Sequence, residues 1–371
     1  MNFKISKREF SDALSLSVRA ISNTTPLPVL TGIKLIVNSD SIVLISSDSN
    51  ISIKVELNNK EKEILFIDAG GEIVLDARYI LEIVRKIDSE FINIETIDGN
   101  LIKIFGGNSE FKLNGINSFE YPDINFNTNN ESFKIETEKF FEIINQTSFA
   151  CSDKDTRPIL TGVNFKALAG KLYINATDSY RLATKTIDID SELNFNITVP
   201  CKYLNDVCHS ISNEKEIEIA IDNQKIIFMF NNSIIQTRLL DDAFPDVSKL
   251  IPNNFTQKLV VSSKELVNAI DRSSFIKSDG KNIVKMNINN EEIILTSSNQ
   301  IGSSYENIKI VSFEGEQFEI SCSGKYLTDA IKSLDCNEII ISFSGELKPL
   351  IITNEKDDSI IQLISPVRTY K

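Results

Sequence analysis

Tryptophan is absent from this sequence of 371 residues, histidine occurs once, and cysteine occurs five times. The single histidine, His209, cannot supply both a catalytic base and a set of metal ligands. An odd number of cysteines scattered along a chain of this length is typical of reduced thiols rather than of a disulfide framework. The cysteine pattern therefore indicates a protein of a reducing compartment.

Long hydrophobic runs are also missing. The longest apolar runs, such as residues 226–230, are far shorter than the roughly 20 residues that span a bilayer. The first ten residues include two lysines, an arginine and a glutamate, which leaves no room for the apolar region of a signal peptide. We expect a cytoplasmic, globular protein that does not cross a membrane.

The sequence contains no G-x-G-x-x-G, no Walker A Gly-Lys-Ser/Thr and no H-E-x-x-H motif. Cys201, Cys208 and His209 lie close together in the sequence and could suggest a metal site. However, the two cysteines are seven residues apart on an expected helix and no fourth soft ligand lies nearby, which favours core packing. We therefore expect no metal and no cofactor.

Two groups of carboxylates could suggest acid–base chemistry. Asp178 lies near Arg181, and Asp153 lies near Asp155. Enzymes use such positioned carboxylates for proton transfer, but short charged clusters of this kind are also ordinary in turns. We favour the turns, and the sequence predicts no catalytic residue.

Acidic residues exceed basic ones, 52 to 39, and the formal net charge is −13. Such a chain repels phosphate on average, so binding to nucleic acid requires local positive charge. The six expected helices, at 7–20, 76–86, 138–150, 201–210, 262–277 and 323–334, together carry +3, which leaves −16 for the rest. Because surface helices often carry Lys and Arg, an ordinary solvated face also accounts for this distribution.

An internal repeat organises the chain. Pro-Val-Leu-Thr-Gly-Ile at 28–33 recurs as Pro-Ile-Leu-Thr-Gly-Val at 158–163, an offset of 130 residues. The same offset relates Phe10 to Phe140 and Asp48 to Asp178. A constant spacing over this length indicates a duplicated structural unit.

Later landmarks predict a third unit. Tyr79, Tyr203 and Tyr326 follow one another at spacings of 124 and 123 residues. Tyr-Pro-Asp at 121–123 and Phe-Pro-Asp at 244–246 close the first two units, and Ser-Pro-Val-Arg at 365–368 stands where the third unit should close. The third unit lacks the Pro-x-Leu-Thr-Gly turn and has residues 279–283 instead. The predicted domains are 1–126, 127–253 and 254–371.

The hydrophobic periodicity changes in the same order within each unit. Apolar residues at helical spacing open the unit, as at Phe10, Ala13 and Leu14, and alternating runs typical of antiparallel strands follow. A second helix is expected at 76–86, where Asp76 is placed to cap it. Two helices and roughly eight strands per unit predict an α+β fold with the helices on one side of the sheets.

These residues together resemble the bacterial sliding clamp, the beta subunit of the DNA polymerase III holoenzyme. The resemblance covers the whole chain and rests on its three units and on the motifs at 27–32, 177–183, 244–246 and 365–368. It implies three tandem clamp-type domains, each with two helices packed on antiparallel sheets, and a head-to-tail homodimer that forms a ring of six domains. The implied function is to encircle double-stranded DNA and confer processivity on the replicative polymerase, without catalysis.

The resemblance also implies a peptide pocket between the second and third domains. Its partners would be the DNA polymerase III alpha subunit, the clamp loader and repair proteins that carry a linear motif with Gln, Leu and Phe anchors. Tyr180, Lys249 and Ser365 depart from common family residues, and residues 369–371 extend past the usual end. The implied pocket residues are Leu160, Thr177, Ser179, Tyr180, Arg181, Leu182, Pro245, Lys249, Leu250, Tyr326, Leu363, Ile364, Ser365, Pro366, Val367 and Arg368. Arg181 and Arg368 would donate hydrogen bonds at the rim, and the leucines, Ile364 and Val367 would desolvate apolar anchors. Without the resemblance, interdomain core is the preferred explanation of these leucines.

Two further sets of residues are expected at surfaces. Basic side chains on the expected helices, with two from the loop near 155, would follow the phosphate backbone without reading bases. These DNA-facing residues are Arg78, Arg85, Lys154, Arg157, Lys202, Lys325 and Lys332. Thr24 stands where some relatives have an arginine that contacts DNA, so the first repeat departs from the family at this position. The implied subunit joint places Phe111 and Leu113 against Phe275 and Ile276 of the partner.

Two other classes of function remain open at this point. A repetitive β-rich scaffold that recognises only proteins would have the same periodicities, and a hydrolase without a known motif has little support. Closure into a ring around DNA would separate the first of these from a clamp.

Overall fold

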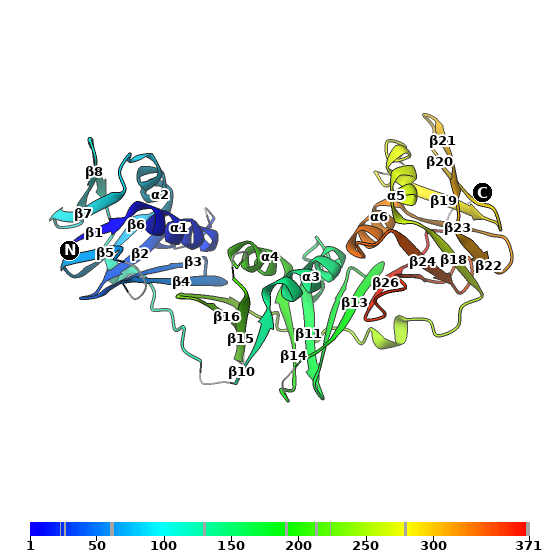
Figure 1. Ribbon diagram of the computed structural model, residues 1–371, viewed down its shortest axis with the longest axis horizontal. Helices are drawn as coiled ribbons and strands as arrows, with labels where there is room; N and C mark the ends of the chain where they lie inside the picture. The colour runs from blue at the N-terminus through cyan, green and yellow to red at the C-terminus, as the bar shows by residue number, and fades with distance from the viewer. Residues whose placement is uncertain are drawn as a thin grey trace. The chain divides into compact units, whose positions relative to one another are not determined.

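The computed structural model describes residues 1–22, 24–25, 27–59, 63–128, 131–189, 192–211, 214–222, 224–277 and 280–368 (Figure 1). The extension at residues 369–371 lies outside the described residues, as does Asp279 of the third repeat. The chain divides into two compact units. Unit 1 comprises Met1–Glu138 and Tyr203–Leu239, and unit 2 comprises Lys139–Lys202 and Leu240–Lys371.

Unit 1 contains two antiparallel sheets. The five-stranded sheet has the order β5-β1-β7-β8-β9, and its strands are β1 (Asn2–Ser6), β5 (Leu65–Ala69), β7 (Phe91–Asp98), β8 (Leu101–Gly106) and β9 (Ser109–Asn114). The eight-stranded sheet has the order β10-β15-β16-β17-β4-β3-β2-β6. Its strands are β2 (Gly32–Val37), β3 (Ser41–Ser47), β4 (Ile51–Asn58), β6 (Gly71–Asp76), β10 (Ser132–Glu136), β15 (Glu216–Asp222), β16 (Lys225–Phe230) and β17 (Ser233–Arg238). This sheet therefore joins strands of the first and second repeats.

Unit 2 also contains two antiparallel sheets. The nine-stranded sheet has the order β14-β11-β12-β13-β26-β25-β24-β18-β22. Its strands are β11 (Gly162–Leu168), β12 (Lys171–Thr177), β13 (Arg181–Asp188), β14 (Phe195–Pro200), β18 (Gln257–Ser262), β22 (Ser312–Glu314), β24 (Glu338–Phe343), β25 (Leu350–Thr353) and β26 (Ile360–Ile364). The four-stranded sheet, β21-β20-β19-β23, is formed by β19 (Ile283–Ile288), β20 (Glu292–Ser298), β21 (Ser303–Lys309) and β23 (Phe318–Ser323). The second and third repeats meet where β13 pairs with β26.

The helices recur in the same place within each repeat. One helix follows the first strand of the repeat and another follows a later strand, as the periodicities predict. The helices are α1 (Lys7–Ser17), α2 (Ala77–Lys86), α3 (Thr137–Thr147), α4 (Cys201–Ser210), α5 (Ser263–Arg272) and α6 (Gly324–Ser333). The Asp76 side chain caps α2 by accepting hydrogen bonds from the backbone N–H groups of Arg78 and Tyr79, which confirms the predicted N-cap. None of the described helices is both long and apolar enough to cross a membrane.

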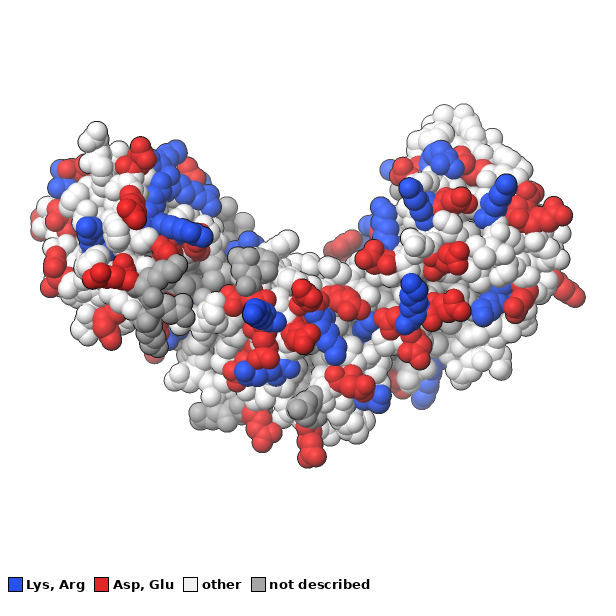
Figure 2. Space-filling view, viewed as in Figure 1, with Lys and Arg blue, Asp and Glu red and all other residues white. Residues whose placement is uncertain are grey.

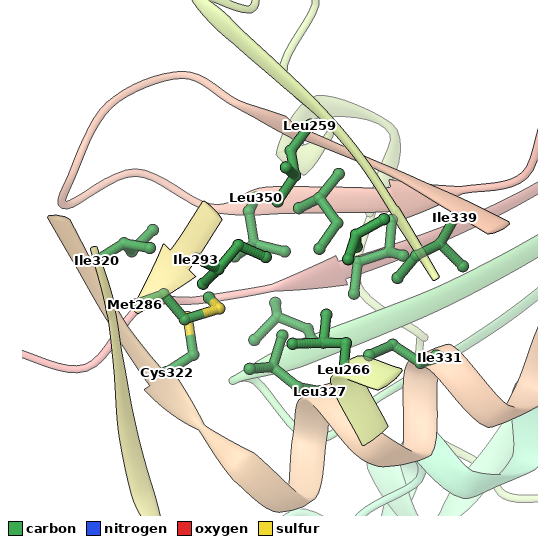
Figure 3. Close-up of a cluster of buried hydrophobic side chains, with 14 of the residues drawn as sticks. Leu259, Leu266, Met286, Ile293, Ile320, Cys322, Leu327, Ile331, Ile339 and Leu350 are labelled. Atoms are coloured by element: carbon green, nitrogen blue, oxygen red, sulfur yellow. The ribbon is translucent and has the colours of Figure 1, made fainter. Parts of the chain in front are cut away.

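The third repeat has a continuous hydrophobic core. Leu266 of α5 and Leu327 of α6 face Met286 of β19 and Ile293 of β20 (Figure 3). All four side chains are fully buried, and Cys322 of β23 lies among them. Burial raises the pKa of the Cys322 thiol to about 12, so this sulfur is held protonated. The amphipathic faces of the two helices thus supply one side of the core and the sheets supply the other.

The repeated Pro-x-Leu-Thr-Gly turn has a steric basis. Each copy forms a 3₁₀ turn, η2 (Pro28–Thr31) or η5 (Pro158–Thr161), and ends at a glycine that begins a strand. A Cβ on Gly32 would lie 2.5 Å from Val74 Cγ1, and a Cβ on Gly162 would lie 2.7 Å from the Val199 carbonyl oxygen. These contacts are too short for any side chain, so the close approach of the neighbouring strand requires glycine.

The third repeat accommodates this close approach with a glycine at a different position. Asn282 precedes β19, and its carbonyl accepts a hydrogen bond from the Gly324 backbone N–H at 2.9 Å. A Cβ on Gly324 would lie 2.1 Å from the Asn282 side-chain oxygen. In the third repeat the glycine therefore lies at the start of α6, opposite Asn282, and not at the start of β19. This difference explains why the turn motif is missing from the third repeat.

Candidate functional site

The candidate peptide pocket lies entirely within unit 2, where β13 pairs antiparallel with β26. Leu182 faces Leu363 across this pair, and Arg181 faces Ile364. Beyond the last strand, the Ser365 N–H donates to the Tyr180 carbonyl at 2.9 Å. These hydrogen bonds hold the C-terminal segment against the turn that precedes β13.

That turn is tied by its own side chains. Thr177 Oγ1 donates to the Arg181 carbonyl at 2.6 Å and accepts from the Ser179 N–H at 3.1 Å. Asp178 Oδ1 accepts from the N–H groups of Tyr180 and Arg181 at 2.9 and 3.0 Å. Ser179 has a positive φ of 77°, and Ser49, its counterpart in the first repeat, has a φ of 78°. The turn presents the Tyr180 side chain to solvent, 63% exposed.

Arg181 is buried beneath the turn, with 6% of its side chain exposed. Its Nε donates to Asp178 Oδ2 at 3.0 Å and its terminal nitrogen donates to Asp329 Oδ2 at 2.7 Å. The guanidinium also lies 4.5 Å from the centre of the Tyr326 ring. The sequence predicts Arg181 as a donor at the rim, and the structure corrects this to a supporting role, because a buried charge requires its partners inside the protein.

Tyr326 connects this support to α6. Its side chain is half-buried and packs against the core of the third repeat. Burial raises the pKa of the Tyr326 phenol, and the nearby Asp178 carboxylate raises it further. The phenol therefore stays protonated, and the Arg181 guanidinium rests on its ring as a cation–π contact.

An apolar cluster forms the floor of the pocket. Leu182, Val247, Ile351 and Leu363 are buried together, each at most 8% exposed. Half-buried Phe244, Ile251 and Ile361 pack against them. Leu160 and Ile364, at 3% and 0% exposed, belong to the interior of the same unit. Of the predicted apolar residues, Leu182 and Leu363 thus form the floor, and Leu160 and Ile364 belong to the core.

Val247 and Ile351 are members of this cluster that the sequence interpretation missed. Val247 follows the Phe-Pro-Asp motif directly, so an apolar residue adjoining the motif was an available signal. Ile351 lies on β25, which pairs with β26 so that Ile351 faces Leu363. No local pattern reveals such a strand pairing, because backbone hydrogen bonds are the same for every residue.

The rim of the pocket is exposed or half-buried. Leu250 is 51% exposed, and Lys249 and Arg368 are exposed. Asp246 accepts hydrogen bonds from the Ser248 hydroxyl and backbone N–H at 2.6 and 3.1 Å, and these bonds lower the pKa of its carboxyl. They fix the 3₁₀ turn η6 (Ser248–Leu250), which positions Lys249 and Leu250. The other rim residues are half-buried: Pro245, Tyr326, Ser365, Pro366 and Val367.

The seven predicted DNA-facing residues are all exposed, and they lie on helices or on the loop before η5. Arg78 and Arg85 belong to unit 1, and the other five, Lys154, Arg157, Lys202, Lys325 and Lys332, belong to unit 2. Figure 2 shows Lys and Arg interspersed with Asp and Glu on the visible face. Local positive charge therefore occurs within a surface of mixed sign.

The residues predicted for the subunit joint fall into two classes. Phe111 and Leu113 lie half-buried on β9, an edge strand of the five-stranded sheet. Phe275 is 76% exposed, but Ile276 is only 3% exposed. Ile276 therefore belongs to the core of its own chain, and its prediction as an interface residue is corrected on that ground. Asn282 explains the difference, because its side-chain nitrogen donates to the Ile276 carbonyl at 3.1 Å and fixes this segment.

Within the described part of the chain, no three His, Cys, Asp or Glu side chains are grouped so as to hold a metal ion. Asp178 and Arg181, which could suggest acid–base chemistry, are used in the tied turn.

Comparison with known proteins extends these observations to the whole chain. Family models of the N-terminal, central and C-terminal domains of the DNA polymerase III beta subunit match residues 1–125, 134–246 and 248–368. The beta sliding clamps of Bacillus subtilis (strain 168) and Staphylococcus epidermidis are 38% and 34% identical to it, over 378 and 376 residues, with 100% of each chain covered.

Solved structures give the same result. The crystal structure of the DNA polymerase sliding clamp from Bacillus subtilis matches with a TM-score of 0.96 at 37% identity, and 100% of both chains is covered. The DNA polymerase III beta chain from Streptococcus pneumoniae TIGR4 matches with a TM-score of 0.96 at 31% identity, covering 99% of this chain and 100% of that one. The chain therefore belongs to the DNA polymerase III beta subunit family, the bacterial sliding clamps.

Proposed function

We propose that two copies of this chain join head to tail into a ring that encloses duplex DNA and tethers the replicative polymerase to it in the cytoplasm. The observation that carries this proposal is the full-length match to sliding clamps together with the threefold repeat. In this proposal the repeats are the domains 1–126, 127–253 and 254–371. The protein is a processivity factor and performs no reaction of its own.

Enclosure suits the charge of the chain. A net charge of −13 disfavours tight binding to phosphate, whereas a closed ring needs only weak contacts that do not depend on sequence. We assign these contacts to the exposed cations Arg78, Arg85, Lys154, Arg157, Lys202, Lys325 and Lys332. Each would neutralise a phosphate transiently, so the ring can slide over every sequence.

The subunit joint is proposed at two edge strands. β9 and β21 each end a sheet and present unpaired backbone groups, which favour addition of another strand. Phe111 and Leu113 on β9 would pack near the exposed Phe275 of the partner chain. Because the two surfaces differ, the contact is heterologous and must close into a ring to avoid growing into a filament.

The pocket of unit 2 is proposed to bind the linear motifs of the polymerase alpha subunit, the clamp loader and repair proteins. The Leu182 and Leu363 floor would receive the Leu and Phe anchors of the motif. Tyr180, Lys249 and Arg368 at the rim would contact the peptide backbone or its polar side chains.

Ring closure can be tested on circular DNA. The protein is loaded onto nicked circular DNA with a clamp loader and ATP, washed in high salt, and then treated with an enzyme that linearises the DNA. We expect retention in high salt and release on linearisation, because enclosure is not screened as ion pairs are. Retention that persists after linearisation would contradict the proposal, and a lack of retention on either form of DNA would favour a scaffold that binds only proteins.

The pocket can be tested with two exposed leucines. Leu250 lies at the proposed rim at 51% exposed, and Leu347 lies elsewhere in unit 2 at 63% exposed. Leu250→Ala is expected to weaken binding of a labelled Gln/Leu/Phe peptide by about tenfold, whereas Leu347→Ala should leave it unchanged. Truncation after Ser365 should abolish binding and leave the dimer intact, since it keeps β26 and the Ser365–Tyr180 hydrogen bond. Unchanged affinity in both pocket variants would refute the assignment.

A further inference from the structure

Unit 1 contains a cavity of about 670 Å³ that the proposed clamp function does not use. Sites for small ligands and short peptide segments fall in this size range. The turn between β3 and β4, the segment after Tyr121 and the ends of β16 and β17 line it. Its polar and charged lining includes Ser47, Ser52, Asp123, Lys225, Gln236 and Arg238.

The turn at this cavity has the same hydrogen bonds as the turn at the pocket of unit 2. Ser47 Oγ donates to the Ile51 carbonyl at 3.0 Å and accepts from the Ser49 N–H at 3.0 Å. Asp48 Oδ1 accepts from the N–H groups of Asn50 and Ile51, both at 2.9 Å. These are the bonds that Thr177 and Asp178 make in unit 2, at an offset of 130 residues.

The strand pairing is repeated as well. β4 pairs antiparallel with β17, and Ser52 faces Gln236, as Leu182 faces Leu363 in unit 2. The Arg238 N–H donates to the Asn50 carbonyl at 2.9 Å, which corresponds to the bond from Ser365 to Tyr180. The backbone of the cavity in unit 1 therefore reproduces the backbone of the pocket in unit 2.

The side chains change the chemistry of the floor. The leucine pair of unit 2 is replaced by Ser52 and Gln236, each 8% exposed. Ser52 Oγ is 2.8 Å from Ser47 Oγ, and Gln236 Oε1 accepts from Lys225 Nζ at 3.0 Å. A floor with these polar groups cannot desolvate two large apolar anchors without leaving hydrogen bonds unmade. It instead suits a polar ligand.

Arg238 stands where unit 2 has Ser365. Its side chain is exposed, and within the described residues its guanidinium forms no ion pair or hydrogen bond. Lys225 faces it across the β16–β17 pair and uses its Nζ on the Asn125 carbonyl and on Gln236. Two carboxylates, Asp123 and Asp222, also line the cavity, but among the residues that the structure describes no ion pair joins either of them to Arg238. The guanidinium is thus available to a carboxylate from outside.

We propose that this cavity is a second linear-peptide site, selective for a segment that carries Asp or Glu beside small polar or apolar side chains. The acidic residue pairs with Arg238, and the polar floor of Ser52 and Gln236 accepts the neighbouring residues. The choice of a peptide rests on the function proposed for unit 2, whose scaffold this cavity repeats, whereas the preference for a carboxylate rests on Arg238 itself.

The probes are two fluorescein-labelled peptides, Gly-Ser-Leu-Asp-Ser-Gly and the same peptide with Asn in place of Asp, measured by anisotropy with the full-length protein. The Asp peptide is expected to bind at least tenfold more tightly than the Asn peptide. Arg238→Gln should remove this preference, and Lys249→Gln, which removes a rim cation of unit 2, should leave it unchanged. Equal binding of the two peptides, or an unaltered preference in Arg238→Gln, would overturn the proposal.

A labelled Gln/Leu/Phe peptide separates this proposal from that for unit 2. It should bind the Arg238→Gln variant as it binds the unchanged protein. If it binds while the Asp peptide does not, the second site is refuted and the pocket of unit 2 stands. If it fails to bind the unchanged protein, the proposed function of the unit 2 pocket fails by itself.

The ligand preference of the cavity in unit 1 can also be converted to that of the pocket in unit 2. A double variant, Ser52→Leu with Gln236→Leu, restores the leucine pair of unit 2. A variant that retains its circular dichroism spectrum should lose the Asp preference and bind two Gln/Leu/Phe peptides per chain instead of one. A stoichiometry that stays at one would show that the repeated scaffold does not form a peptide site. If the double variant does not fold, Arg238→Gln still decides the question.

Discussion

The Arg181 guanidinium donates to the Asp329 carboxylate at 2.7 Å, and this ion pair joins β13 of the second repeat to α6 of the third. Only 6% of the Arg181 side chain is exposed. The same guanidinium holds Asp178, whose carboxylate ties the turn that displays Tyr180. One buried cation therefore couples the shape of the pocket to the packing of the two repeats.

Replacing Arg181 should destabilise unit 2. Arg181→Ala leaves Asp178 and Asp329 without their partner, and removal of one member of a buried pair costs about 3 kcal/mol, less here because Asp329 is 29% exposed. We expect a fall of roughly 2 kcal/mol in the free energy of unfolding by urea, with weaker binding of the Gln/Leu/Phe peptide. Lys332→Ala, which removes an exposed cation on α6, the helix of Asp329, is the control. Equal stability of the two variants would contradict the supporting role.

The Asp357 carboxyl should make the free energy of unfolding depend on pH. Burial alone would raise the pKa of its carboxyl, but hydrogen bonds from Lys185 and Ser359 outweigh burial and lower it. Lys185 Nζ lies 2.6 Å from the Asp357 carboxylate and 2.9 Å from that of Glu142. Because the folded pKa is below the unfolded one, this stabilisation is present above about pH 4 and is lost as the pH falls through the folded pKa.

The measurement is urea unfolding between pH 7 and pH 3. Asp357→Asn should lower the free energy of unfolding at pH 7 and reduce its dependence on pH below about 4. Asp358→Asn changes an exposed neighbour and should retain the dependence of the unchanged protein. If the free energy of unfolding of Asp357→Asn depended on pH as steeply as that of the unchanged protein, this carboxylate would be ruled out as the source of the pH dependence.

The glycine that ends the repeated turn should not tolerate a side chain. Gly162→Ala places a Cβ within 2.8 Å of three atoms from Thr198, Val199 and Leu240. Such crowding typically costs about 1–3 kcal/mol, which a lower Tm would report. Gly302→Ala, where no atom lies within 4 Å of the added Cβ, should change stability by less than about 0.5 kcal/mol. Similar Tm values for the two variants would contradict the steric explanation.

The proposed joint predicts monomers from exposed positions. Phe275→Asp places a charge on a side chain that is 76% exposed in the single chain, so the fold should persist while the dimer dissociates. Sedimentation velocity should show the mass of one chain. Phe119→Asp, at 94% exposed, is the matched control and should remain a dimer. A persistent dimer of Phe275→Asp would disprove this part of the joint.

Ile276→Asp should behave differently from its neighbour. Its side chain is 3% exposed, so a buried carboxylate would lower the Tm of the chain itself. Circular dichroism melting distinguishes this loss of folding from simple dissociation. A normal Tm with a monomeric mass would instead restore Ile276 as an interface residue.

Local patterns were sufficient for the helices. Asp76 was recognisable as a cap because its position before an apolar face is a short-range signal, and the structure shows its two hydrogen bonds. The predicted helices at 7–20 and 262–277 extend past the observed α1 and α5, since the last residues form 3₁₀ or other turns instead. The end of a helix depends on which backbone carbonyls find hydrogen-bond donors, and the spacing of apolar residues does not reveal this.

The role of Arg181 shows where sequence reasoning stops. A charged residue in a motif near a pocket reads as a surface donor, and only the position of Asp329, 148 residues further along the chain, shows that the charge is buried and paired. Ile276 presents the opposite case, since an apolar residue next to exposed Phe275 gives no sign of which of the two faces inward.

By itself, the sequence determined the three repeats, the order of helices and strands within them, and the excess of negative charge, because these follow from spacing, periodicity and composition. Only the tertiary structure decided that strands of neighbouring repeats share one sheet, that β17 lies beside β4 and β26 beside β13, and that two equivalent scaffolds carry an apolar and a polar floor. The physical reason is that strands pair through backbone hydrogen bonds common to all residues. Which distant side chains become neighbours is therefore settled by packing of the whole unit.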